Sequence, residues 1–169
     1  MDEIVNRVAA SGLITIDLEE LYPSGERVLY DLAQNLWQGL VLKEKDFRAF
    51  LKEKDWSEYA GKHVAIACSE DAIVPAWASM LLATKLQEHA QTVFFGSLEA
   101  LEVVLFDRMI NQLNAIEYND ARVVIKGCSK LPVPQHAYVA LTAHLVPVVK
   151  SLLFGEPCST VQLYKRQKK

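Results

Sequence analysis

The sequence predicts an α/β fold: a mostly parallel central sheet flanked by helices, with an N-terminal strand pair or extension. Short runs of β-branched and apolar residues alternate along the chain with segments of helical periodicity. The segments are joined by short turns that contain Gly or Pro. Of the 169 residues, 51% are hydrophobic and 23% charged, which is enough apolar material for one core. We therefore expect a single α/β domain over residues 1–169.

The N-terminal third contains two predicted strands on either side of a turn. Residues 13–17 and 27–32 are rich in apolar and β-branched side chains, and residues 23–25 form a Pro-Ser-Gly turn between them. We expect the two strands to form a loose, hairpin-like pair. A short helix is expected over residues 4–10, whereas residues 35–42 are compatible with strand or helix.

Three further strands are expected where short apolar runs end in turns. They cover residues 63–67, 92–95 and 121–125, and a last strand is expected over residues 161–164.

Amphipathic periodicity predicts four helices beyond residue 44. Helices are expected over residues 45–54, 75–88, from 98 onward and 135–154. Ser97 is the expected N-cap of the third helix. Pro147 interrupts the fourth, so a kink or split is expected near it. The predicted apolar faces are Phe47, Phe50 and Leu51; Trp77, Met80 and Leu81, widened by Leu82; and Leu98, Leu101, Leu105 and Met109.

Charge and hydropathy argue against nucleic-acid and membrane partners. The net charge is −3, and the basic side chains cluster only in the C-terminal tail over residues 165–169. The longest apolar stretch, residues 72–83, is too short to span a bilayer, which takes about 20 residues. The acidic start Met1-Asp2-Glu3 is unlike a signal peptide. A cytoplasmic location is expected, where thiols stay reduced.

The three cysteines are the strongest candidates for distinctive chemistry. Cys68 and Cys128 each follow a predicted strand, so in one parallel sheet both would lie at the edge where open α/β folds bind ligands. Cys158 follows a predicted helix that leads to the opposite edge. It joins the other two only if Pro147 bends that helix back or if the last strand is antiparallel.

A thiolate site for zinc or an iron–sulfur cluster is one interpretation of these cysteines. Soft sulfur ligands favour these metals, so the candidate metal ligands are Cys68, Cys128 and Cys158. A closed site needs a fourth ligand, and an open site leaves that position to water or substrate. The neighbours Glu70, Asp71, Glu156 and His136 have no diagnostic spacing, and the chain lacks a C-x-x-C pair.

Two other interpretations stay open. Free cysteines often pack as small apolar side chains, which would make the protein a binding or structural module with inert thiols. Alternatively, Cys68 precedes a helix whose N-terminus could activate it as a nucleophile, although Glu70 and Asp71 oppose a thiolate there. No histidine is paired with Cys68 by a recognisable motif, so whether the protein is an enzyme, and with which catalytic residues, stays undecided.

The remaining polar and aromatic features favour structural roles. The acidic region Asp17, Glu19, Glu20 and Glu26 lacks the spacing of a calcium loop and is interpreted as a solvated face. The three tryptophans are expected to be core or interface anchors. Phosphate-binding glycine motifs are absent from the sequence.

Four segments, the most particular of them around Cys158, resemble the uncharacterised bacterial family called domain of unknown function 2480. The segments are residues 42–48, 68–75, 124–128 and 155–161. The likeness covers nearly the whole chain and implies no activity. It does imply a neighbourhood of iron–sulfur cluster assembly genes. The leading hypothesis is therefore a small cytoplasmic protein with a three-cysteine site, accessory to iron–sulfur metabolism and working with assembly proteins. A homo-oligomer is left open.

Overall fold

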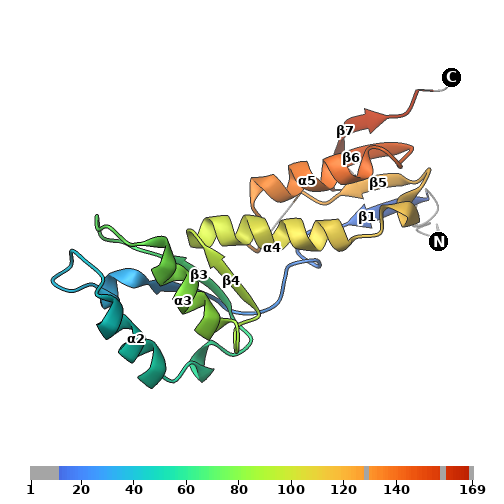
Figure 1. Cartoon of the computed structure of the whole chain (residues 1–169). Coiled ribbons are helices and arrows are strands. Elements are labelled where there is room, and N and C mark those ends of the chain that lie inside the picture. Colours follow the sequence, from blue (N-terminus) through green and yellow to red (C-terminus); the bar gives the residue numbers. More distant parts are fainter. Residues whose placement is uncertain (1–11, 128–129, 157–158, 168–169) are drawn as a thin grey trace. The chain divides into compact units, whose positions relative to one another are not determined.

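The computed structural model describes residues 12–127, 130–156 and 159–167 (Figure 1). Its contacts divide the chain into two compact units. Unit 1 is formed by Met1–Pro23 and Glu102–Lys169, and unit 2 by Ser24–Leu101. Within the described ranges, no helix is both long and apolar enough to cross a membrane.

Unit 1 contains a four-stranded sheet in the order β1-β5-β6-β7. Strands β1 (Leu13–Ile16), β5 (Arg122–Ile125) and β6 (Ser151–Glu156) run parallel, and β7 (Ser159–Lys165) is antiparallel to β6. The register aligns Ile16 with Ile125, and Ile125 with Phe154. The residues that follow β1, β5 and β6 therefore leave the sheet at one edge.

Helices α4 (Leu98–Gln112) and α5 (Gln135–Leu145) both contribute to the packing of unit 1, and the short 3-10 helix η3 (Ala115–Tyr118) follows α4 and leads into β5. Side chains from both helices pack with alternate residues of β1, β5 and β6, which share one face of the sheet. The buried cluster consists of Ile16, Leu18, Phe106, Ile110, Val123, Ile125, Ala137, Leu141, Leu145, Val149 and Leu152.

Unit 2 contains a parallel three-stranded sheet in the order β2-β3-β4. Its elements are β2 (Arg27–Asp31), η1 (Leu32–Asn35), α2 (Glu44–Glu53), η2 (Ser57–Tyr59), β3 (His63–Ala67), α3 (Ala76–Leu86) and β4 (Thr92–Phe95). The buried cluster consists of Tyr30, Leu32, Leu42, Phe47, Leu51, Trp56, Val64, Ile66, Ala78, Leu82 and Leu86. The predicted α/β class with mostly parallel strands is confirmed, with the strands distributed over two sheets.

Local capping agrees with the sequence at the start of α4. The Ala100 N–H donates to Ser97 Oγ at 3.2 Å, as expected for an N-cap serine. Gly96 precedes it with φ +147°, in the region that favours glycine, and closes β4.

The predicted strand pairing at the N-terminus is wrong. β1 and β2 are both present, but β1 pairs with β5 and β2 with β3. Parallel partners are brought together by tertiary structure, and the turn at residues 23–25 leads from one unit to the other rather than closing a hairpin.

The predicted helix over residues 135–154 is also wrong in its second half. Helix α5 ends at Leu145, two residues before Pro147, and β6 begins at Ser151. Proline cannot continue the hydrogen-bond ladder of a helix. Residues 151–156 pair with β5 on one side and β7 on the other, so their backbone groups are satisfied in the middle of a sheet.

The buried face of α3 differs from the predicted one. Ala78, Leu82 and Leu86 are buried, at i, i+4 and i+8, while Met80 is 68% exposed. The helix is apolar around most of its circumference, so periodicity alone does not distinguish the face that meets the sheet.

Candidate functional site

The carboxyl edge of the unit 1 sheet carries an ion pair between two neighbouring strands. Asp17 follows β1 and Lys126 follows β5, and Lys126 Nζ lies 2.7 Å from Asp17 Oδ2. The backbone N–H of Glu19 donates to Asp17 Oδ1 at 2.9 Å. The ion pair therefore links the carboxyl ends of β1 and β5.

The ion pair shifts the ionisation of both partners. Burial of Asp17 acts to raise its pKa, but the hydrogen bonds from the Lys126 ammonium and the Glu19 N–H outweigh burial and hold the pKa below its ordinary value. The Asp17 carboxylate raises the pKa of Lys126 in turn. Both groups are therefore charged at neutral pH, which suits a structural pair.

Glu19 anchors the loop after β5. Its Oε1 accepts the backbone N–H groups of Lys130 and Leu131, the latter at 3.1 Å. Two members of the acidic region are thus engaged by partners on the same sheet edge, and a third, Glu26, pairs with Lys62 at 2.9 Å. The sequence predicts that this acidic region is a solvated face, whereas these three side chains make structural contacts.

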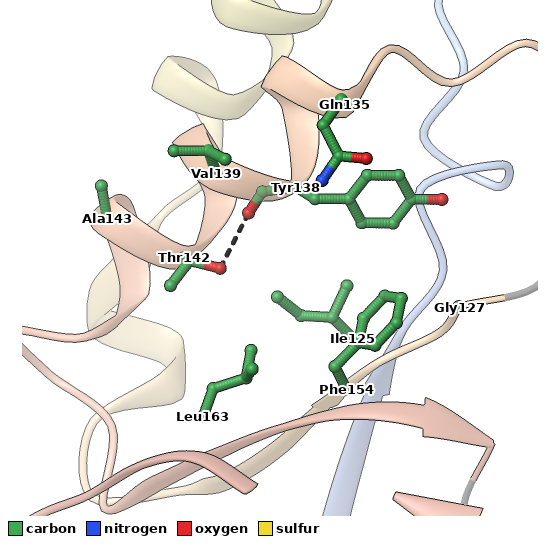
Figure 2. Close-up of a pocket in the computed structure, with 9 residues that line it drawn as sticks. All are labelled: Ile125, Gly127, Gln135, Tyr138, Val139, Thr142, Ala143, Phe154 and Leu163. Atoms are coloured by element: carbon green, nitrogen blue, oxygen red, sulfur yellow. Dashed lines mark hydrogen bonds between the residues drawn. The ribbon is translucent and has the colours of Figure 1, made fainter. Parts of the chain in front are cut away.

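A pocket of about 690 Å³ lies between α5 and the strands β5, β6 and β7. Figure 2 shows its walls: side chains of α5 on one side, and those of the sheet on the other. The lining residues are Ile125, Gly127, Gln135, Tyr138, Val139, Thr142, Ala143, Phe154 and Leu163. Ile125 and Gly127 place it at the carboxyl end of β5, the side on which α/β sheets bind ligands.

Aromatic packing shapes the inner part of the pocket. The rings of Tyr138 and Phe154 meet edge to face, with centroids 5.7 Å apart and planes at 89°. A Cβ at Gly127 would come within 2.9 Å of Phe154 Cζ, so glycine at this position lets the Phe154 ring lie against the backbone. Gly127 therefore leaves room for the Phe154 ring in the wall of the pocket.

Few polar groups line the pocket. Thr142 Oγ1 donates to the backbone oxygen of Tyr138 at 2.8 Å, a bond drawn in Figure 2, so its proton is already used within α5. The Gln135 amide and the Tyr138 hydroxyl are the other polar side-chain groups of the lining. A mostly apolar pocket with few polar groups is typical of small-molecule sites.

Cys68 lies in unit 2, immediately after β3. It is half-buried, and its Sγ is 3.6 Å from the Glu70 carbonyl oxygen. It lines a small cavity of about 230 Å³ together with Leu29, Asp31, Ala67, Ser69, Ser97, Leu98 and Glu99. The sequence correctly places this thiol at the carboxyl end of a parallel strand. The expectation that Cys68 and Cys128 follow strands of one sheet is wrong, because β3 and β5 belong to different sheets.

Asp31 gives the cavity around Cys68 an acidic character. The Asp31 carboxylate accepts hydrogen bonds from the Ser69 hydroxyl and from the Ala33 N–H, the latter at 2.9 Å. These bonds, that of Ser69 above all, lower the pKa of Asp31. Reactive thiolates are usually found in electropositive surroundings. The described surroundings of Cys68 thus do not favour the nucleophile interpretation.

Cys128 and Cys158 lie outside the described residues. Their described neighbours belong to adjacent strands: Gly127 follows β5, and Glu156 ends β6 and pairs with Ser159 of β7. Over the described ranges, no group of three or more His, Cys, Asp or Glu side chains is arranged to hold a metal ion.

Sequence reasoning missed the pocket because it missed β6. Phe154, on that strand, and Leu163 of β7 both line the sheet side of the pocket, opposite α5. The signal was present as Pro147 followed by the apolar run at residues 151–154, which is typical of a buried strand as well as of a helix.

Fold and site together define an α/β protein with an apolar pocket at the carboxyl end of a largely parallel sheet. The comparison with protein families is specific: the family model described as "Protein of unknown function (DUF2480)" matches residues 2–166. The chain belongs to this family. Neither the curated proteins nor the solved structures yielded a match.

Proposed function

We propose that the protein is a binding module that holds a small, mostly apolar molecule in the pocket between α5 and β5-β6-β7. The observation that carries the proposal is the pocket itself, whose volume of about 690 Å³ is within the range of small-molecule sites. Its floor is preformed, because Ile125 is 1% exposed and the Tyr138 and Phe154 rings are packed against each other.

Titration with N-phenyl-1-naphthylamine, an uncharged dye that fluoresces in apolar surroundings, tests this proposal. The pocket-filling variant Ala143→Phe should weaken dye binding by about tenfold or more, because the new ring occupies the space between α5 and Leu163. The matched control Ala76→Phe places the same ring on an exposed position of α3 and should leave binding unchanged. Equal binding by the wild type and both variants contradicts the proposal.

A second candidate function is a thiolate site at Cys128 and Cys158, the two expected metal ligands that belong to unit 1, which would hold zinc or an iron–sulfur cluster. It is favoured by β6, which runs parallel to β5 and aligns Phe154 with Ile125. Cys128 and Cys158 follow these two residues within a few positions, so the chain returns towards one sheet edge before each of them. This candidate includes a cytoplasmic location, because its thiolates must stay reduced. It also includes iron–sulfur assembly proteins as partners.

Elemental analysis of protein purified without oxygen tests the thiolate candidate. The wild type should retain zinc or iron, and Cys128→Ser and Cys158→Ser should each lose most of it, because a missing thiolate opens the coordination shell. Cys68→Ser shows whether the third thiol takes part. Wild-type protein free of both metals would rule this candidate out.

A further inference from the structure

The pocket under α5 lacks charge on its walls. The described residues that line it include no Asp, Glu, Lys, Arg or His. Isoleucine, valine, leucine and phenylalanine make up much of the lining, and the amide of Gln135 and the hydroxyls of Tyr138 and Thr142 are neutral. A ligand that enters this pocket exchanges water for apolar surface.

Two basic side chains next to lining residues in the chain already have partners. Lys126, next to Gly127 in the chain, has its ammonium 2.7 Å from Asp17. His136, on the first turn of α5, has Nε2 2.7 Å from Asp107 Oδ1. Neither side chain is therefore available to pair with a charged ligand without breaking an existing contact. Burying a charge without a partner is strongly unfavourable.

We propose that the ligand of this pocket is uncharged, and that Gly127 sets the depth to which it enters. This inference rests on the proposed binding function and adds a ligand class and a specificity-determining residue. A Cβ at Gly127 would come within 2.9 Å of Phe154 Cζ. A side chain at position 127 would drive the Phe154 ring away from the backbone and into the space the ligand needs.

A pair of dyes that differ by one charged group tests the ligand class. N-phenyl-1-naphthylamine and 8-anilinonaphthalene-1-sulfonate share an aryl-amine skeleton, and only the second carries a sulfonate. With the full chain, the sulfonated dye should bind about tenfold or more weakly at the site that Ala143→Phe blocks. Affinity from fluorescence titration is the measurement.

The outcomes separate the two proposals. If both dyes bind equally well and Ala143→Phe weakens both, the ligand class is wrong while the binding function stands; the sulfonate would then be held at the N-terminus of α5, beside Gln135. If Ala143→Phe affects neither dye, the binding function fails and the inference fails with it. Sedimentation that shows a dimer whose formation excludes the uncharged dye would assign the pocket to a second copy and overturn both.

A glycine substitution tests the depth. Gly127→Ala should weaken binding of the uncharged dye by about tenfold, because the displaced Phe154 ring fills part of the pocket. In the double variant Gly127→Ala with Phe154→Leu, the smaller side chain relieves the crowding, and binding should recover relative to the single variant. Unchanged binding in Gly127→Ala, with the protein folded by circular dichroism, would refute the role of Gly127.

Discussion

His63 shows how buried polar side chains are satisfied in this protein. Its ring is 3% exposed, with Nε2 2.7 Å from the Ser24 carbonyl oxygen and Nδ1 3.0 Å from Thr92 Oγ1. A carbonyl only accepts, so Nε2 donates to Ser24, while the threonine hydroxyl can donate to or accept from Nδ1. The ring also lies against Gly25, where an added Cβ would come within 2.9 Å of Nε2. His63 therefore joins a turn to a strand and has no free nitrogen for catalysis.

Asp17 makes a prediction about acid stability. Its pKa is lowered in the folded protein, so its contribution to folding is fully present above the ordinary value of 3.8 and is lost as the pH falls from there through the lower, folded pKa. Asp17→Asn removes this contribution. The free-energy gap between wild type and variant in urea should therefore be wide at pH 7 and shrink on acidification below pH 3.8.

The control for Asp17→Asn is Asp71→Asn, at an exposed position after β3. That variant should differ little from the wild type at either pH, because surface substitutions away from special contacts change stability by about 0.5 kcal/mol or less. A gap for Asp17→Asn that stays constant from neutral to acid pH would contradict the assignment of the Asp17–Lys126 pair.

At the scale of elements, β6 decides the architecture of unit 1. It separates β5 from β7, and its parallel direction carries the chain back to the carboxyl edge. The sequence predicts that Cys158 joins the other cysteines only if Pro147 bends the helix back or the last strand is antiparallel. The described residues of β7 are antiparallel to β6, as the second condition requires. The kink expected at Pro147 is instead the end of the helix.

The buried face of α3 yields a prediction at the same scale. Leu82 is fully buried and Met80 is 68% exposed. Leu82→Ala should lower the free energy of unfolding by about 2–5 kcal/mol, because it leaves a cavity against the sheet. Met80→Ala should change it by about 0.5 kcal/mol or less. Urea unfolding followed by circular dichroism measures both, and a larger loss for Met80→Ala would restore the face predicted from periodicity.

At the scale of the whole molecule, each unit has its own hydrophobic cluster, yet the boundary between Leu101 and Glu102 falls within helix α4. Unfolding one unit therefore removes helical hydrogen bonds from the other. For this reason we still predict that residues 1–169 unfold cooperatively, as a single domain.

One unfolding transition is the expected result. All three tryptophans, Trp37, Trp56 and Trp77, belong to unit 2, so their fluorescence reports that unit, while circular dichroism reports both. Leu141→Ala, in the core of unit 1, should shift both signals to lower urea by the same amount, equivalent to about 2–5 kcal/mol. A shift seen by circular dichroism alone would show that the units unfold independently.

The sequence by itself determined the α/β class, the positions of most strands, and the placement of Cys68 at a strand end. These features depend on local periodicity, on β-branched runs and on capping residues such as Ser97, all of which act over a few neighbouring positions.

Only the tertiary structure decided the pairing of β1 with β5, the strand β6, the buried face of α3 and the pocket. Residues 151–156 are apolar enough for either a helix or a strand, and their hydrogen-bond partners lie on β5 and β7 rather than nearby in the chain. The pocket needs Gly127, Tyr138 and Phe154 from three different segments. No local pattern encodes such contacts, because their free energy arises from surfaces that meet only when the chain is folded.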